Sequence, residues 1–123
     1  MERMRRRADF RRCYRNGQKL GGRWMVLHLL ARHAEGPGVL RVGFTVSRRV
    51  GKAVVRNRVK RRLRESLRRW VMGLSLAGDL VVAARPPAAG ASYGDLDEEM
   101  GRLLRKAVRL GGAQRGGEGE GPV

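Results

Sequence analysis

The chain has 123 residues, with 28 Lys and Arg against 11 Asp and Glu and a net charge of +17. This length suits one domain with a single small core. No apolar run approaches the roughly 18 residues of a membrane span, and the N-terminus lacks the apolar stretch of a secretion signal. We therefore expect a protein that does not associate with membranes. The lone cysteine, Cys13, cannot form an intramolecular disulfide, which favours a reducing, cytoplasmic setting.

The positive charge is concentrated in two segments. Residues 1–20 hold eight cations and two anions, and residues 41–70 hold twelve cations and one anion. A solvated surface does not need such clustering, so the pattern predicts a polyanionic partner. Arginine outnumbers lysine by 24 to 4, which suits phosphate and base contacts. Codon bias or adaptation to heat would explain that ratio equally well, but neither explains the clustering.

The first half of the chain predicts a helix and two strands. The helix spans about residues 5–15, where Phe10, Cys13 and Tyr14 share a face, and Asn16-Gly17 ends it. A strand over residues 24–31 has two covered faces, one with Trp24, Val26, His28 and Leu30 and the other with Met25, Leu27 and Leu29. Residues 35–38 predict a turn. The strand over residues 40–46 directs Leu40, Val42, Phe44 and Val46 to the core and leaves Arg41, Gly43 and Thr45 on an open face.

A long cationic helix follows. Its apolar stripe predicts packing on a sheet and consists of Val55, Val59, Leu63, Leu67, Trp70, Val71 and Leu74. Its cations fall into two rows. The marginal row lies beside the stripe and consists of Arg56, Lys60, Arg64 and Arg68, whereas the outward row consists of Arg58, Arg61, Arg62 and Arg69. Because marginal side chains can direct their charges over the neighbouring sheet, two separate nucleic-acid contacts are possible.

The last part of the chain predicts a strand, a helix and a tail. The strand covers residues 80–84 and ends at Pro86-Pro87. Ser92 and Asp95 have the spacing of a helix N-terminal cap, and the helix buries Leu96, Met100, Leu103, Leu104 and Ala107. We expect one domain over residues 1–112 and a flexible, Gly-rich tail over residues 113–123.

The sequence contains no catalytic constellation. His28 and His33 have no acidic partner in register, and the consecutive residues Asp97, Glu98 and Glu99 would fan around a helix rather than converge on a metal. No phosphate-binding glycine motif occurs. Any chemistry would therefore depend on groups supplied by another molecule.

Five features of the sequence belong together. Residues 41–49, RVGFTVSRR, lead directly into the cationic segment of residues 51–65, GKAVVRNRVKRRLRE. The second segment resembles the RNR signature of the bacterial ribonuclease P protein family, and the first resembles the strand leading into it. The other three are Asp9-Phe10 with Tyr14 and Gly17, Ala84-Arg85-Pro86, and Ser92-Tyr93 with Asp95-Leu96. The order and spacing of these features make the resemblance specific over about residues 4–110.

The resemblance implies both a fold and a function. The fold is α+β, a two-layer α/β sandwich of order αβββαβα, ribosomal-protein-like, with a left-handed βαβ crossover. The function is that of the protein subunit of ribonuclease P, an endoribonuclease that removes the 5′ leader of precursor tRNA by Mg²⁺-dependent phosphodiester hydrolysis. The catalytic RNA and precursor tRNA are then the partners, with no DNA or membrane. The RNA carries the catalytic centre, so we expect no catalytic side chain and no metal site in the protein.

The resemblance also implies two groups of binding residues. The cleft for the single-stranded leader consists of Phe10, Tyr14, Val26, His28, Thr45, Lys60 and Arg64. Contacts with the catalytic RNA involve Lys52, Arg56, Asn57, Arg58, Arg61 and Arg62. Aromatic rings stack on unpaired bases and neighbouring cations follow the phosphates. His28 stands where the family often has a phenol, and its imidazole is smaller and titratable.

Other interpretations of these residues stay open. Phe10 and Tyr14 could be ordinary core residues that pack the first helix on the sheet. A structural binder of folded RNA, such as a ribosomal protein, would share the charge and fold but would not prefer precursor over mature tRNA. A DNA-binding architectural protein is less favoured, because the evenly cationic helix indicates phosphate contact rather than reading of a groove.

Overall fold

The computed structural model describes residues 1–31, 39–74 and 76–120, the last ten of these by the course of the backbone. The order of elements is β1 (Glu2–Arg3), α1 (Arg7–Asn16), β2 (Gln18–Gly21), β3 (Met25–Leu30), β4 (Leu40–Thr45), the 3-10 helix η1 (Arg48–Val50), α2 (Ala53–Val71), β5 (Gly78–Ala84), the 3-10 helix η2 (Pro86–Gly90) and α3 (Tyr93–Glu120). From α1 to α3 this is the αβββαβα order that the family resemblance implied. The residue patterns had predicted neither β2 nor β1, and β1 is an addition to that order. The predicted turn at residues 35–38 and His33 lie outside the described residues.

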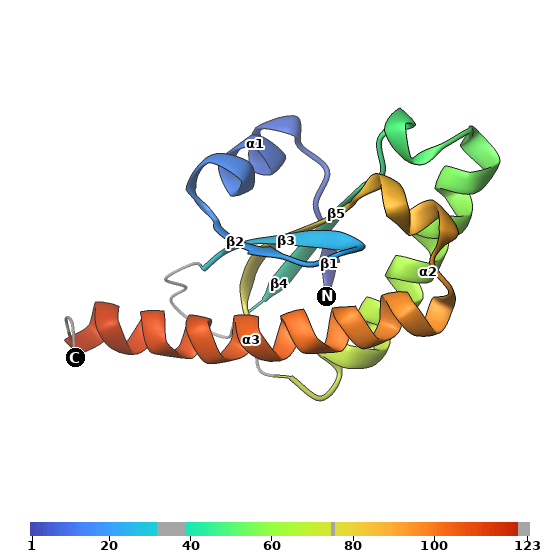
Figure 1. Ribbon diagram of the computed structural model, residues 1–123. Helices are drawn as coiled ribbons and strands as arrows, with labels where there is room; N and C mark the ends of the chain where they lie inside the picture. Colours follow the sequence, from blue (N-terminus) through green and yellow to red (C-terminus); the bar gives the residue numbers. More distant parts are fainter. Residues whose placement is uncertain (32–38, 75, 121–123) are drawn as a thin grey trace.

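The strands form one mixed sheet in the order β1-β4-β5-β3-β2. β4 and β5 are parallel neighbours joined through α2, and β3 is antiparallel to both β5 and β2. β1 pairs in parallel with β4 at the edge of the sheet. Figure 1 shows α1 on one face of the sheet and α3 on the other. The left-handed sense of the β4-α2-β5 crossover stays a prediction.

The main core lies between the sheet and the helices α2 and α3. Met25, Leu27 and Leu29 of β3 are buried there, as the predicted alternation requires, and the stripe of α2 packs against them through Val59, Leu63 and Leu67. Leu96, Met100, Leu103 and Leu104 complete this core from α3. Trp24 was predicted on the face of His28 but packs against the main core. Trp24 directly precedes β3, so the alternation of side chains along that strand does not determine the face to which the Trp24 side chain points.

A smaller cluster lies between α1 and the opposite face of the sheet. Met4, Cys13 and Val81 are buried in it, with Phe10 and Leu30 packed alongside. The prediction that this face of β4 is open is therefore wrong in part. Gly43 is buried because α1 crosses above it.

The ends of the helices follow local chemistry. Gly51 adopts φ 152°, a conformation that favours glycine, and joins η1 to α2. At the start of α3, the Asp95 backbone N–H donates to Ser92 Oγ at 3.0 Å and the Ser92 N–H donates to Asp95 Oδ2 at 3.1 Å, which confirms the predicted cap. α3 continues past the predicted boundary at 112 to Glu120. The flexibility of residues 113–123 stays a prediction.

Candidate nucleic-acid interface

Three lateral rows of residues define the sheet face that α1 partly covers. The strand register places Val26, Ala83 and Thr45 side by side in one row and His28, Val81 and Gly43 in the next. Leu30, Asp79 and Arg41 form the third row. The predicted leader-binding residues Val26, His28 and Thr45 therefore share one face, although they come from strands that β5 separates.

Phe10 packs directly on the backbone of β4. A Cβ added to Gly43 would lie 2.4 Å from ring atoms of Phe10, well inside van der Waals contact. The absence of a side chain at Gly43 thus lets α1 approach the sheet closely. Phe10 is half-buried, so it has a packing role and still leaves part of its ring accessible.

Buried ion pairs fix α1 to the sheet. The Arg41 guanidinium donates from Nε and Nη2 to the two carboxylate oxygens of Asp79, each at 2.9 Å, and its Nη1 lies 3.4 Å from Asp9 Oδ2. Hydrogen bonding and charge from Asp79 raise the pKa of Arg41 further above its ordinary value. Asp9 belongs to α1 and directly precedes Phe10, so this network sets the position of the helix that carries the aromatic side chains.

Cys13 is a free thiol buried in the smaller cluster. Its Sγ lies 3.5 Å from the Asp79 carbonyl oxygen. Burial, followed by the nearby charge of Asp79, raises the pKa of Cys13 to about 11. The thiol therefore stays protonated at neutral pH.

Tyr14, Thr45 and His28 form a polar and aromatic contact beside Phe10. The Tyr14 hydroxyl donates to Thr45 Oγ1 at 2.7 Å. The rings of Tyr14 and His28 pack edge to face, with their centroids 4.6 Å apart. Tyr14 is 41% exposed, which contradicts an ordinary core role for this residue. Burial and then the charge of Lys19 lower the pKa of His28, so a neutral imidazole is favoured.

A pocket of about 180 Å³ lies where the edge of β4 is free of β1. The β1–β4 pairing ends at Arg3 and Val42, and beyond this point the pocket is walled by α1 on one side and α2 on the other. Its lining contains three cations, two aromatic rings and no carboxylate: Arg3, Met4, Phe10, Val42, Gly43, Phe44, Lys60 and Arg64. The Arg64 guanidinium lies 5.9 Å from the centroid of the Phe44 ring.

The structure thus brings the predicted leader residues into one region. Phe10, Lys60 and Arg64 meet in the pocket, while Tyr14, Thr45, His28 and Val26 continue the same sheet face. Neither Arg3 nor Met4 was predicted, because Arg3 lies in a two-residue strand that Met4 directly follows, and so short a strand has no detectable periodicity. Phe44 was predicted in the core, where the residue does pack, but the same ring also lines the pocket.

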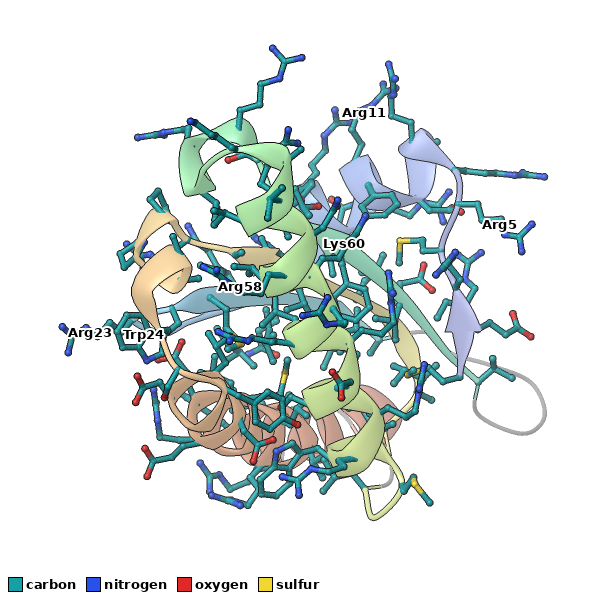
Figure 2. All side chains as sticks on the ribbon, turned by 90° about the vertical axis from the view of Figure 1, so that its right-hand side faces the viewer. Arg5, Arg11, Arg23, Trp24, Arg58 and Lys60 are labelled. Atoms are coloured by element: carbon teal, nitrogen blue, oxygen red, sulfur yellow. The ribbon has the colours of Figure 1, made fainter. Side chains whose placement is uncertain are left out.

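The two cationic rows of α2 face different surroundings. Figure 2 shows Lys60 and Arg58 on opposite sides of this helix. Within the RNR segment, Lys52, Asn57 and Arg61 are exposed, and Arg56 Nε donates to the Gly51 carbonyl at 3.1 Å. Two members of the marginal row, Lys60 and Arg64, line the pocket at the β4 edge.

The prediction that the outward row projects into solvent is wrong in part. Arg58 donates to the Ala89 carbonyl at 3.1 Å and Arg62 to the Ala91 carbonyl at 3.2 Å, so both are half-buried against η2 and its C-terminal end. Arg69 pairs with Asp97 of α3, which also accepts hydrogen bonds from Ser66 and Trp70. Helix periodicity could not reveal this, because η2 and α3 pack on that side only in the tertiary structure. Each guanidinium has five N–H donors, so Arg58 and Arg62 keep donors beyond these bonds.

Another buried carboxylate has a structural role. Glu99 of α3 accepts hydrogen bonds from the backbone N–H groups of Arg23, Trp24 and Met25 at 2.7 to 2.9 Å. Among the residues that the structure describes, no group of three His, Cys, Asp or Glu side chains could hold a metal. Within the same residues, no helix is long and apolar enough to cross a membrane.

Comparison with known proteins identifies relatives over nearly the full chain. The ribonuclease P family model matches residues 1–108. A ribonuclease P protein component from Nocardioides sp. is 45% identical over 111 residues, covering 89% of this chain and 95% of the relative. One from Acidothermus cellulolyticus is 38% identical over 112 residues, covering 91% and 92%.

Solved structures show the same likeness. The Staphylococcus aureus RNase P protein aligns with a TM-score of 0.77 at 30% identity, covering 87% of this chain and 95% of that one. The Thermotoga maritima RNase P protein aligns with a TM-score of 0.71 at 26% identity, covering 89% and 97%. The fold, and not only the RNR signature, is therefore shared.

Proposed function

The chain belongs to the bacterial ribonuclease P protein family, and on that premise we propose how it serves as the protein subunit of this RNA-containing enzyme. The cleft between α1, β4 and α2 binds the single-stranded 5′ leader of precursor tRNA. The RNR segment binds the catalytic RNA. The protein thereby holds the two RNAs in register while the leader is removed, in the cytoplasm.

The observation that carries this proposal is the composition of the pocket at the β4 edge. Aromatic rings from α1 and β4 lie beside Lys60 and Arg64, and none of the residues that line this pocket has a carboxylate, although Glu2 lines the adjoining one. Such a combination suits a single strand, whose unpaired bases can stack while its backbone follows the cations. Base stacking contributes about 1 to 3 kcal/mol per base, and Phe10 and Tyr14 present their rings on the same side of α1.

The catalytic centre lies, in this proposal, in the RNA subunit. Of the six RNR-segment residues assigned to the catalytic RNA, all but Asn57 are Lys or Arg, whose charged side chains donate hydrogen bonds but have no lone pair to offer a metal. Mg²⁺ required for hydrolysis would therefore take its ligands mainly from RNA. The contribution of Lys52, Arg56 and Arg61 is to neutralise phosphates that are brought close together near the cleavage site.

Arg58 and Arg62 have a second role within the same segment. Their bonds to the Ala89 and Ala91 carbonyls fix the guanidinium groups against η2. An arginine held in this way loses less side-chain freedom when it meets a phosphate. These residues thus stabilise the fold and present preorganised donors to the catalytic RNA.

Reconstitution with a cognate catalytic RNA tests the proposal. The protein should restore leader cleavage at low Mg²⁺ and should increase affinity for precursor tRNA more than for mature tRNA. If it changes neither the Mg²⁺ requirement nor this preference, the proposal fails. A structural binder of folded RNA would give that result.

A pair of matched double variants separates the two surfaces. Lys60→Gln with Arg64→Gln should weaken binding of precursor but not mature tRNA. The slope of log affinity for precursor tRNA against log salt concentration should become shallower by about 0.7 units for each lost single-strand contact. Lys52→Gln with Arg61→Gln removes the same charge from exposed positions of the RNR segment. It should weaken assembly with the catalytic RNA whether or not a leader is present. Identical behaviour of the two variants would refute the division into two surfaces.

A further inference from the structure

The N-terminal segment and α1 carry more positive charge than the proposed cleft uses. Residues 5–15 contain six arginines and one carboxylate, Asp9. That carboxylate is buried and pairs with Arg41 and Arg12. Among the residues that the structure describes, Arg7, Arg11 and Arg15 form no ion pair, and all three are exposed.

These three arginines form one row on α1. They are spaced by four residues, so they follow one side of the helix over about 12 Å at 1.5 Å per residue. Arg7 precedes Phe10 by three residues and Arg11 precedes Tyr14 by three, which makes each arginine a surface neighbour of an aromatic side chain. The arginine row therefore borders the aromatic side of the cleft. Figure 2 shows Arg11 directed outward from α1.

The row is unfavourable for the isolated protein. Like charges four residues apart on a helix repel one another, and cations in the first turn oppose the helix dipole. A helix that needed these positions only for solubility could alternate its charges. An external anion that lies along the row would remove the repulsion.

We propose that Arg7, Arg11 and Arg15 bind phosphates of the leader after it leaves the cleft, and so extend the RNA path over the outer side of α1. This inference rests on the proposed function of the cleft. The contacts are electrostatic and independent of sequence, because guanidinium groups on an open helix surface meet the backbone rather than the base edges. Their contribution depends on salt and begins only when the leader is long enough to reach them.

The test uses the reconstituted holoenzyme and precursor tRNAs whose leaders are shortened one nucleotide at a time. The variant is Arg7→Gln with Arg11→Gln and Arg15→Gln, since glutamine keeps a high helix propensity. The matched control is Arg105→Gln with Lys106→Gln and Arg109→Gln, which removes the same charge from exposed positions of α3 across the sheet. A third protein carries lysine at the three α1 positions and keeps the charge.

We expect the α1 glutamine variant to lose affinity for long leaders and to match the wild type once the leader ends within the cleft. On long leaders, the slope of log affinity against log salt concentration should become shallower by about two units, because each of the three lost contacts removes about 0.7 units. The lysine protein should retain most of the affinity, because backbone phosphates need charge more than a planar fork.

Three results would overturn the proposal in distinguishable ways. A loss equal to that of the α3 control shows that the row is ordinary solvated surface. A loss that persists with the shortest leader and with mature tRNA shows that the row contacts the catalytic RNA instead. If the wild-type holoenzyme itself does not prefer precursor over mature tRNA, the proposed function fails, and this inference fails with it.

Discussion

Replacing Gly43 with alanine tests how closely α1 is packed on the sheet. The new Cβ would lie 2.4 Å from the Phe10 ring, whereas carbon atoms in contact normally lie about 3.5 to 4.0 Å apart. The ring must therefore move by more than about 1 Å. Such overpacking costs about 1 to 3 kcal/mol. Gly43 is not among the described glycines with positive φ, so its backbone conformation does not itself oppose alanine.

The measurement is a double-mutant cycle with Phe10→Ala, using urea unfolding of the four proteins. In the wild-type background Gly43→Ala should destabilise the protein. With Phe10 truncated the contact disappears, and alanine should stabilise the strand by about 0.5 to 1 kcal/mol over glycine. Gly43→Ala should also weaken precursor tRNA binding, because Phe10 leaves its position in the cleft. The reasoning is refuted if Gly43→Ala has the same effect on stability in both backgrounds.

Three further predictions concern buried and titratable groups on the same side of the sheet. Asp79→Asn should lower the free energy of unfolding by roughly 3 kcal/mol, because the Arg41 charge loses its buried partner. This is the lower end of the range for breaking a buried ion pair, since the Arg41 side chain is 25% exposed. Unchanged urea unfolding would contradict this prediction. The His28 ring should titrate below 6.5 by NMR, and Lys19→Gln should raise its pKa part of the way back. Because the folded pKa of His28 is the lower one, its contribution to stability is present above pH 6.5 and is lost as the pH falls below that value; a ring that titrates above 6.5 would reverse the sign. Cys13, with its pKa raised to about 11, should react with an aromatic disulfide far more slowly in the folded protein than in urea, and equal rates would show that the thiol is accessible.

Local patterns predicted most of the fold because they report directly on burial. The alternation Met25, Leu27, Leu29 and the helical stripe through Val59, Leu63 and Leu67 both lie in the main core. The Ser92–Asp95 cap forms as its spacing indicates. β1 was missed because two residues give no period, and Trp24 was misplaced because it lies outside the strand that its pattern suggested.

The candidate site was predicted as a set of residues, but not as an arrangement. The family resemblance named Phe10, Lys60 and Arg64, and the structure places all three around one pocket. That pocket also depends on Arg3 of β1 and on Met4, which directly follows it, and no local pattern connects either residue with β4. The outward row shows the same limit, since helical spacing separates Arg58 and Arg62 from the apolar stripe but cannot show that η2 lies against them.

The sequence by itself determined the chemistry of this protein: a concentrated arginine charge, a cationic helix with two rows, and aromatic side chains spaced along the first helix. These are properties of composition and of a 3.6-residue period, so they need no knowledge of neighbours. Only the tertiary structure decided which of these cations also bind the protein itself. Arg41, Arg58, Arg62 and Arg69 bond to carbonyls or carboxylates brought near by distant segments. The physical reason is that a guanidinium binds whichever acceptor the fold places within reach, and the fold is set by packing across the whole chain.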